Sequence, residues 1–245
     1  MQKLFVTGGS GFIGSKLISL ILKNNKNFEI HAVYNKNKIM LKSNQNLFKY
    51  RINLANKKFL FKKLRKIDPD IILNLAGFKN PRKNQLNKKK SYTDNFLINK
   101  LLVDFCKINK KKIIFTSSDL VYSDYEKKPS ERRNIKPSTI YGENKLKSER
   151  YIKKNLKKYL ILRFATVYDE MDSSDTNFIN FSYNSIKKKK KIIAASNIYR
   201  SFISIQLLTK IIMKLIILKI NGTFNIGEKP SSYYNKIKSI CIKKK

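Results

Sequence analysis

The amino-acid sequence predicts an α/β protein with a doubly wound parallel sheet and a small C-terminal lobe. Short runs rich in β-branched and aromatic residues alternate with longer segments of helical periodicity, which is typical of a parallel sheet covered by helices on both faces. Several short runs, such as IIFT at residues 113–116, are continuously apolar and therefore suit strands buried on both sides. A cluster of glycines directly follows the first run and opens the first helical segment.

The expected elements follow in regular order up to Phe164. We expect strands at residues 3–6, 29–34, 50–54, 70–75, 113–116 and 159–163, and helices at residues 11–23, 56–67, 91–108 and 139–153. Beyond Phe164 the pattern loosens, and we expect a helix at 173–191, a strand at 192–194, a helix at 205–219, a strand at 223–226 and a short helix from Ser231. We therefore expect a main domain at residues 1–164 and a small lobe at residues 165–245 that is interleaved with the main sheet.

The composition fits a globular chain, because 42% of the 245 residues are hydrophobic and can form a sizeable core. No run of about 18 residues is apolar and free of charge, which argues against a membrane-spanning helix. The N-terminus also lacks the apolar region of a secretory signal. Cys106 and Cys241 lie far apart and fit a reducing compartment, so we expect a cytoplasmic protein. The single histidine, His31, excludes a multi-histidine metal site, and we expect no metal.

The formal net charge is +38, from 54 basic and 16 acidic residues. Such a charge is typical of nucleic-acid-binding proteins, but here the basic residues are spread along the chain and comprise 46 Lys and only 8 Arg. Proteins selected for phosphate contacts usually use more Arg, whose planar fork makes paired hydrogen bonds. We therefore attribute the charge to a coding bias toward Lys, Asn and Ile, and expect neither a specific nucleic acid nor a membrane as partner.

Half of the chain's eight glycines lie in the segment VTGGSGFIG at residues 6–14. Gly8, Gly11 and Gly14 form a G-x-x-G-x-x-G pattern between a strand and a helix, which is the context of a dinucleotide-binding turn. Glycines allow the backbone to approach a pyrophosphate closely, and the helix N-terminus offers free N–H groups to it. We therefore expect Gly8, Gly11, Phe12, Ile13 and Gly14 to contact NAD or NADP.

The acid that usually follows the second strand is missing. About twenty residues past the glycine turn, an Asp or Glu would bind the ribose 2′-hydroxyl of NAD. Here this strand ends in Tyr34 and Asn35, and Lys36 and Lys38 follow. Removing an anion and adding cations favours the 2′-phosphate of NADP, with Asn35 and Lys36 beside it. We therefore expect NADP to be preferred over NAD.

The segment Y-G-E-N-K places Tyr141 and Lys145 on one face of a helix. An ammonium group beside a phenol lowers the phenol's pKa from about 10, and an oxidised nicotinamide ring adds a second positive charge. Tyr141 is thereby expected to exchange a proton near neutral pH. Upstream, TSSDLVY at residues 116–122 lies just past an apolar strand, where ligands bind in an open parallel sheet. A hydroxyl group there can hydrogen-bond a substrate carbonyl.

Together these motifs resemble the extended branch of the short-chain dehydrogenase/reductase superfamily, which contains NAD(P)-dependent epimerases, dehydratases and reductases of nucleotide sugars. The turn T-G-G-x-G-F-I-G is similar to its glycine motif. PSTIYGENKLKSE at residues 137–149 is similar to its P-x-x-x-Y-G-x-S-K-x-x-x-E, with Asn144 in place of Ser. The resemblance extends from about Phe5 to Gly227. It implies a Rossmann fold, with Ser118, Tyr141 and Lys145 as catalytic residues.

The same resemblance implies binding residues by position. For the cofactor, besides the glycine turn and the end of the second strand, these are Asn53, Leu54, Leu75, Ala76, Gly77, Tyr141, Lys145 and Phe164. For the substrate they are Ser118, Asp119 and Arg200, where Arg200 in R-S-F-I matches an Arg that binds a nucleotide diphosphate. The family's usual Asp is replaced by Asn53, and Arg200 lacks the Asp that usually follows it. The resemblance thus implies a nucleotide-sugar substrate, with a homodimer as one option.

The residues after Ser118 favour one reaction within the superfamily. A 4,6-dehydratase resembles T-D-E here, whereas Leu120 occupies the position of the Glu. SSDLVYSD at residues 117–124 is more similar to the S-T-D-Y-V-F-D-G of dTDP-4-dehydrorhamnose reductase-like enzymes than to the S-S-A-T-V-Y of 4-epimerases. We therefore expect an NAD(P)-dependent reductase of a 4-keto nucleotide sugar, with Tyr141 as proton donor. A nucleotide-sugar 4-epimerase, favoured by the F-I-G of the glycine turn, is one alternative. A non-catalytic NADP-binding regulatory or scaffold protein is another.

Overall fold

The computed structural model describes all residues except 25–26, 123–129, 132–134, 170–177 and 243–245. A seven-stranded sheet forms its centre, with the order β10-β6-β5-β4-β1-β2-β3 and parallel pairing throughout. The strands are β1 (Gln2–Thr7), β2 (Phe28–Tyr34), β3 (Leu47–Arg51), β4 (Ile71–Asn74), β5 (Lys112–Ser118), β6 (Tyr159–Phe164) and β10 (Gly222–Ile226). The strand order reverses between β1 and β4, as it does in dinucleotide-binding sheets. The predicted fold class is confirmed.

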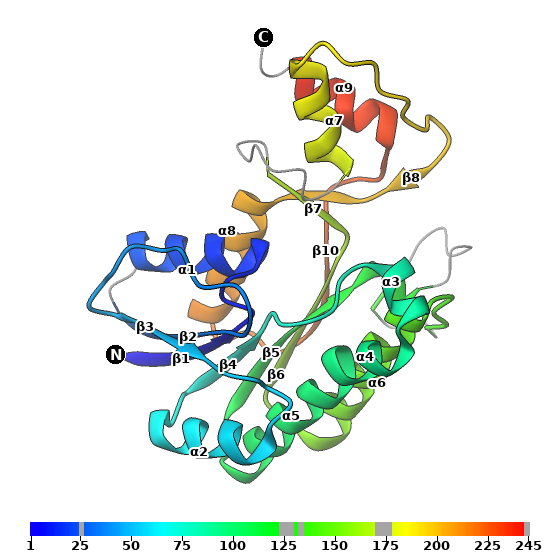
Figure 1. Cartoon of the computed structure of the whole chain (residues 1–245). Coiled ribbons are helices and arrows are strands. Elements are labelled where there is room, and N and C mark those ends of the chain that lie inside the picture. Colours follow the sequence, from blue (N-terminus) through cyan, green and yellow to red (C-terminus); the bar gives the residue numbers. More distant parts are fainter. Residues whose placement is uncertain (25–26, 123–129, 132–134, 170–177, 243–245) are drawn as a thin grey trace.

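Helices cover both faces of this sheet (Figure 1). The helices α1 (Phe12–Asn24) and α8 (Ile205–Ile217) pack on one face, and α2 (Lys57–Ile67), α5 (Ile98–Ile108) and α6 (Ile140–Asn155) pack on the other. Polar side chains cap several of these helices, because a side-chain oxygen satisfies an N–H group that lacks a partner in the first turn. Thr139 Oγ1, for example, accepts a hydrogen bond from Gly142 N at 3.1 Å and so fixes the start of α6.

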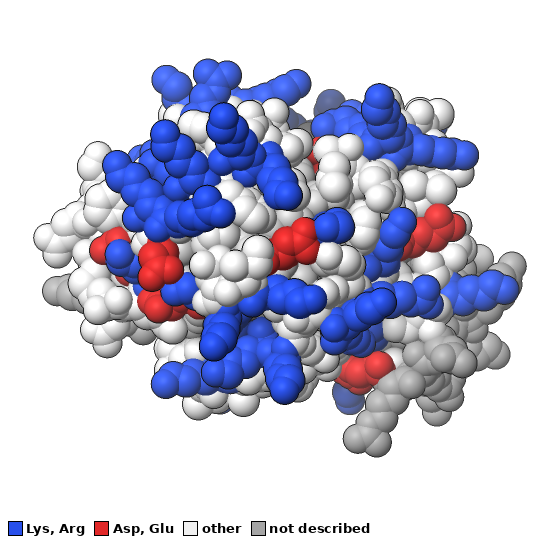
Figure 2. All heavy atoms as spheres, turned by 90° about the horizontal axis from the view of Figure 1, so that it is seen from below, with Lys and Arg blue, Asp and Glu red and all other residues white. Residues whose placement is uncertain are grey.

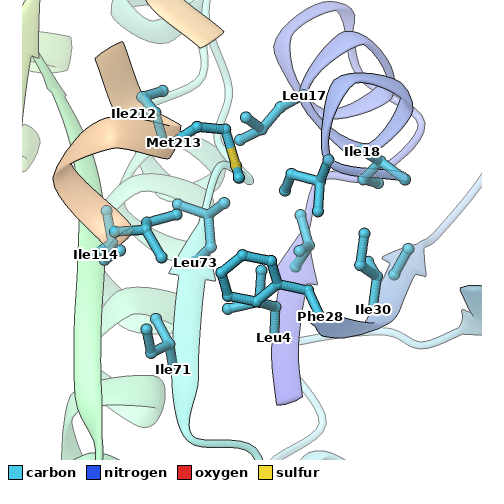
Figure 3. Packing of buried hydrophobic residues seen from close by; sticks show 14 of the residues in the cluster. Leu4, Leu17, Ile18, Phe28, Ile30, Ile71, Leu73, Ile114, Ile212 and Met213 are labelled. Atoms are coloured by element: carbon cyan, nitrogen blue, oxygen red, sulfur yellow. The ribbon is translucent and has the colours of Figure 1, made fainter. Parts of the chain in front are cut away.

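One large hydrophobic cluster covers each face of the main sheet, and smaller clusters lie in the lobe and beside the start of α6. Figure 3 shows the cluster beneath α1 and α8, where apolar side chains from both helices meet side chains from the strands. Its labelled members are Leu4, Leu17, Ile18, Phe28, Ile30, Ile71, Leu73, Ile114, Ile212 and Met213. The strands therefore carry apolar residues on both faces, which explains why their sequences are continuously apolar rather than alternating.

The helix expected at residues 91–108 contains a wider turn. Helix α4 (Lys88–Tyr92) leads into a π-helical segment at Thr93–Leu97, and α5 follows directly. Asn95 lies in this segment. Its main-chain carbonyl accepts a hydrogen bond from Ser148 Oγ at 2.7 Å, and its Oδ1 accepts one from Phe78 N at 3.0 Å. The wide turn thus connects this helix both to α6 and to the segment that follows β4.

Some boundaries differ from those expected. The third strand lies at Leu47–Arg51 rather than at 50–54, and a short helix that was not expected, α3 (Pro81–Leu86), follows β4. Helix α7 spans Phe178–Lys187, and the first residues of the expected helix, 173–177, lie outside the described residues. The strand expected at 192–194 is wrong. The residues there form no strand pairing: Ile193 is 96% exposed, and Ala194 packs on the hydrophobic cluster of the lobe from an irregular segment.

The small lobe lies beyond the carboxyl ends of the strands (Figure 1). It contains β7 (Thr166–Tyr168), α7, β8 (Tyr199–Arg200), β9 (Phe202–Ser204), β11 (Ser231–Ser232) and α9 (Tyr233–Ile242). Between β9 and β11 the chain returns to the main sheet to form α8 and β10. Lys16 of α1 forms an ion pair with the buried Asp169 at 2.9 Å, which connects the first helix of the main domain to the segment after β7.

On the face of the molecule seen in Figure 2, basic side chains are dispersed rather than gathered in one stripe. Figure 2 shows Lys and Arg side chains in several separate groups on the face seen from below, with a few acidic side chains between them. This distribution agrees with the spread of Lys along the sequence. Within the part of the chain that the structure describes, no helix combines the length and the apolar character needed to cross a bilayer.

Candidate active site

Two adjoining cavities lie at the carboxyl ends of the central strands. One, of about 290 Å³, lies beside the glycine turn and the ends of β2 and β4. The other, of about 440 Å³, lies between the ends of β5 and β6, the start of α6 and the segment before β7. Leu75, Gly77 and Lys79 line both cavities. The two spaces therefore adjoin at the end of β4, the position at which ligands bind in sheets of this topology.

The glycine turn has a shape that only glycine permits. Gly8 has a φ of +67°, and a Cβ atom on it would lie 2.9 Å from Ala76 N. A Cβ atom on Gly14 would lie 2.2 Å from Gly8 O. The turn is therefore pressed against both α1 and the end of β4. Ser10 and Gly11, which directly precede α1, line the smaller cavity, so the N-terminus of this helix lies at its edge.

Thr7 fixes the end of β4 relative to this turn. Its Oγ1 donates a hydrogen bond to Asn74 Oδ1 at 2.7 Å and accepts hydrogen bonds from Leu75 N and Ala76 N, both at 3.1 Å. Because every member of this group is buried or half-buried, the two strand ends are held in one relative position. The floor of the cavity is thus formed before any ligand binds.

The structure places the residues expected to contact the cofactor around these two cavities. Lining the smaller cavity are Gly8, Gly11, Asn35, Lys36, Asn53, Leu54, Leu75, Ala76 and Gly77. Lining the larger are Phe12, Ile13, Leu75, Gly77, Tyr141, Lys145 and Phe164. Gly14 lines neither cavity, and its place in the structure is the close packing of α1 against the turn.

Tyr141, Lys145 and Ser118 line the larger cavity together. Lys145 Nζ lies 5.7 Å from the centre of the Tyr141 ring and donates a hydrogen bond to Thr116 O at 2.9 Å. Tyr141 is brought to Ser118 by very close packing, because a Cβ atom on Gly142 would lie only 2.0 Å from Leu120 O. Glycine at position 142 therefore lets α6 approach the turn that follows β5.

Burial dominates the protonation of the two helical residues. It lowers the pKa of Lys145 to about 8, against the opposing charge of Glu149. Burial also raises the pKa of Tyr141, the nearby Asp119 raises it further, and a hydrogen bond with Ser118 lowers it in part. The expectation that the Tyr141 pKa lies below its ordinary value is therefore wrong for the protein alone, because burial and the charge of Asp119 both raise this pKa.

Asp119 and Arg200 form a charged contact between this cavity and the small lobe. Asp119 lines the cavity directly after Ser118, and its Oδ2 lies 3.9 Å from Arg200 Nη1. Arg200 is not part of the cavity lining and reaches the site from β8, which pairs with β11. The structure therefore brings together all three residues expected at the substrate, with Arg200 in the outer position.

Comparison with known proteins identifies the chain at the level of its family. Residues 4–227 match the model of the NAD dependent epimerase/dehydratase family. The chain belongs to this family. The resemblance drawn from the glycine turn and the Y-x-x-x-K segment is thereby confirmed.

Individual relatives of this family member carry different activities in their names. The chain is 25% identical over 171 residues to a dTDP-4-dehydrorhamnose reductase of Aggregatibacter actinomycetemcomitans, an alignment that covers 69% of this chain and 53% of the relative. It is 34% identical over 159 residues to a bifunctional UDP-glucose 4-epimerase and UDP-xylose 4-epimerase of Pisum sativum. This alignment covers 59% of this chain and 45% of the relative. The chain thus spans about half the length of these curated relatives.

Among solved structures, a hypothetical dTDP-4-dehydrorhamnose reductase from Sulfolobus tokodaii superimposes with a TM-score of 0.84 at 25% identity. The superposition covers 99% of this chain and 82% of that one. Nearly the whole chain therefore follows the fold of this neighbour, including the C-terminal lobe.

Several residues of this family member's site were not found by sequence reasoning. Lys79, Asn80 and Pro81 line the larger cavity from the start of α3, and Thr166 and Val167 line it from β7. Burial lowers the pKa of Lys79, which faces both cavities. Its position three residues after Ala76 was a usable signal, but in a chain with 46 Lys its charge alone could not single it out.

Proposed function

We propose that the protein is an NADP-dependent reductase of a 4-keto nucleotide sugar, with Tyr141 as the proton donor. The observation that carries this proposal is one cavity of about 440 Å³ that is lined by Ser118, Asp119, Tyr141 and Lys145 and adjoins the cavity at the glycine turn. A carbonyl group in this cavity can meet the hydroxyls of Ser118 and Tyr141 while a dinucleotide lies along the turn. Family membership supports the same class of reaction.

The residues present fit a dinucleotide. The turn offers the N-terminus of α1 to a pyrophosphate, and side chains on Gly8 or Gly14 would collide with the backbone that shapes it. Lys79 adds a cation where the two cavities adjoin. At the end of β2, Asn35 and Lys36 line the cavity in place of an acid, which favours a 2′-phosphate over a free 2′-hydroxyl.

We assign each of four side chains a separate role in the reduction. NADPH, when bound, supplies the hydride to the carbonyl carbon. The Ser118 hydroxyl holds the carbonyl oxygen, and Tyr141 gives its phenolic proton to that oxygen as negative charge develops there. Lys145 lies beside the Tyr141 ring and stabilises the phenolate that remains. Arg200 is placed to pair with the substrate's diphosphate.

The test is turnover on a panel of nucleotide sugars that carry a 4-keto group, followed by the loss of NADPH absorbance. Tyr141→Phe keeps the ring and its packing but removes the proton, so turnover should fall by at least about two to four orders of magnitude while NADPH binding is retained. Ser118→Ala should slow the chemical step with little change in NADPH affinity. Tyr234→Phe is the matched control, because this side chain is 49% exposed on α9 and lines neither cavity.

A nucleotide-sugar 4-epimerase is the second candidate, and the 34% identity to a relative named for two 4-epimerase activities favours it. An epimerase oxidises and then reduces the same carbon, so NADPH absorbance shows no net change while the sugar is interconverted. Chromatography of the sugar products therefore separates the two candidates. If the unmutated protein turns over no nucleotide sugar by either measurement, a binding role without catalysis replaces both.

A further inference from the structure

Asp169 follows β7 where the lobe joins the main domain. Its carboxylate is completely buried, and its Oδ2 pairs with Lys16 Nζ of α1 at 2.9 Å. Its Oδ1 accepts a hydrogen bond from Gln206 Nε2 of α8 at 2.7 Å. The main-chain N–H and carbonyl of Asp169 bond to the side chain of Asn180 on α7, at 3.2 and 2.6 Å. One acidic residue therefore connects two helices of the main domain to a helix of the lobe.

Lys16 and Asp169 belong to two elements that line the larger cavity. Phe12 and Ile13 line this cavity from α1, and Lys16 lies one turn further along the same helix. Residues 166–167 line the cavity from β7, and Asp169 directly follows this strand. The ion pair thus joins the helix that forms one part of the cavity wall to the strand that forms another part.

The two charges of this pair have different surroundings. The Lys16 side chain is 47% exposed, so its ammonium group can turn to solvent, whereas the Asp169 side chain is completely buried. A buried carboxylate needs hydrogen bonds and a counter-ion, because its transfer from water is costly. Lys16 therefore makes the buried position of Asp169 favourable, and with it the position of the end of β7.

The lobe has other attachments to the main domain. Val167 packs on the apolar cluster beneath α1 and α8, and Ile203 and Ile205 belong to that cluster. Strand β7 also pairs with β9. Apolar contacts are not directional, so they hold the lobe against the sheet without fixing its exact distance from α1. An ion pair between two named atoms supplies this direction.

We propose that Lys16 and Asp169 are positioning residues that set the distance between α1 and β7 in the larger cavity and thereby determine how tightly the nucleotide sugar is held. The proposal rests on the proposed function, because it concerns the substrate of that same cavity. The hydroxyl groups of Ser118 and Tyr141 come from β5 and α6, two elements that carry neither partner of the pair. The pair should therefore affect the binding of the substrate rather than the chemical step.

Cofactor affinity should depend little on this pair. The smaller cavity lies beside the glycine turn and the ends of β2 and β4, and Thr7 Oγ1 joins the turn to β4 by accepting hydrogen bonds from Leu75 N and Ala76 N. Neither Lys16 nor Asp169 lines this cavity. A change in the distance between α1 and β7 should therefore alter substrate affinity and leave the Kd of NADPH nearly unchanged.

Asp169→Asn breaks the ion pair with the smallest change in shape. The amide oxygen can still accept the hydrogen bond from Gln206, but no charge remains to attract Lys16 and no unpaired charge stays buried. The KM for the nucleotide sugar that the panel identifies should rise by about tenfold, while kcat stays near its unmutated value. Lys16→Met should raise KM at least as much. Lys16→Arg should keep KM near the unmutated value, because it retains the charge.

Lys23→Met is the matched control, because Lys23 is exposed in the last turn of α1 and lines neither cavity. It should leave KM unchanged. The double variant of Lys16→Met with Asp169→Asn should raise KM no more than the larger single effect, because both changes break the same contact. An unchanged KM in Asp169→Asn would overturn the proposal. A loss of NADPH affinity as large as the rise in KM would overturn it too, since that result indicates a general loosening of the fold.

Hydrogen exchange tests the same contact without a substrate. In Asp169→Asn the amides of β7 and β9 should exchange faster than in the unmutated protein, because local opening of the lobe becomes easier, while those of β4 and β5 should not change. Lys16→Met carries both measurements if Asp169→Asn does not fold. Equal exchange of β7 in the variant and the unmutated protein would overturn the proposal. Absence of turnover by the unmutated protein would instead refute the proposed function, so the two failures are distinguishable.

Discussion

The carboxylate of Glu149 accepts two hydrogen bonds from the guanidinium group of Arg163, at 2.9 Å from Nε and 2.6 Å from Nη2. Both side chains are almost completely buried, with 1% of each residue exposed. Ser117 Oγ donates a third hydrogen bond to the same carboxylate at 2.6 Å. Glu149 lies one turn beyond Lys145 on α6, so its carboxylate joins this helix to β6 through Arg163 and to β5 through Ser117.

Removing either partner of this pair should destabilise the protein strongly. Arg163→Met leaves the buried Glu149 carboxylate without its counter-ion. Glu149→Leu likewise leaves the buried Arg163 guanidinium without its counter-ion. Each should reduce the free energy of unfolding by about 3–5 kcal/mol. The double variant should lose less than either single variant, because it leaves no unpaired charge. Urea unfolding followed by circular dichroism measures this, and a loss below about 1 kcal/mol in both single variants would contradict it.

Lys145, a proposed catalytic residue, should reduce the stability of the protein at neutral pH. Its pKa falls from an ordinary 10.5 to about 8 on burial, so folding opposes its protonation. The buried ammonium group therefore lowers the free energy of unfolding by about 3 kcal/mol below about pH 8. This loss disappears as the pH rises toward 10.5, because the amine is then neutral in both the folded and the unfolded state. Lys145→Met should therefore raise the unfolding free energy at pH 7 and lose both turnover and cofactor affinity.

The difference in stability between Lys145→Met and the unmutated protein should shrink as the pH is raised from 8 toward 10.5. Lys154→Met, an exposed lysine on the same helix, is the control and should show no such pH-dependent gain. A Lys145→Met variant that is less stable at pH 7 would show that the ammonium group is a net stabilising group in the folded site.

Two glycine substitutions should separate folding from cofactor binding. A Cβ atom at Gly11 meets only Gly8 O, at 3.1 Å, whereas one at Gly14 would lie 2.2 Å from the same atom. Gly11→Asp should fold but place a carboxylate where a pyrophosphate would lie, so NADPH binding should be lost. Gly14→Ala should instead lower the melting temperature. Circular dichroism and NADPH fluorescence distinguish these outcomes, and tight NADPH binding by Gly11→Asp would refute the assignment of the turn.

The end of β2 should select NADPH over NADH. Asn35 and Lys36 line the cavity there, and no acid stands at the position that would bind a 2′-hydroxyl. Fluorescence titration of the unmutated protein should give the lower Kd for NADPH, and Lys36→Ala should narrow the difference. NADH that binds tenfold more tightly, a difference of about 1.4 kcal/mol, would contradict the preference. Lys38→Ala, which does not line the cavity, is the matched control.

The sequence was most informative where local pattern and long-range structure agree. The strands of the parallel sheet are continuously apolar because both faces are covered, and the i, i+4 spacing of Tyr141 and Lys145 places them in one cavity. The π-helical segment at Thr93–Leu97 could not be predicted, because its wide turn is held by contacts of Asn95 with segments distant in the sequence. The direction of the Tyr141 pKa shift was missed for the same reason, since burial is a property of the assembled fold.

The return of the chain from the lobe to form α8 and β10 has a consequence for how this molecule can be divided. A fragment that ends at Phe164 would contain every strand of the main sheet except the last, and it would leave the edge of β6, with the sequence YLILRF, without its parallel neighbour. It would also uncover the sheet face on which α8 packs. Exposed apolar edges of this kind recruit other chains, so such a fragment should aggregate. The segment after Phe164 therefore cannot be exchanged as a unit. A chimaera that takes its lobe from a relative would have to keep residues 205–226 together with the main sheet.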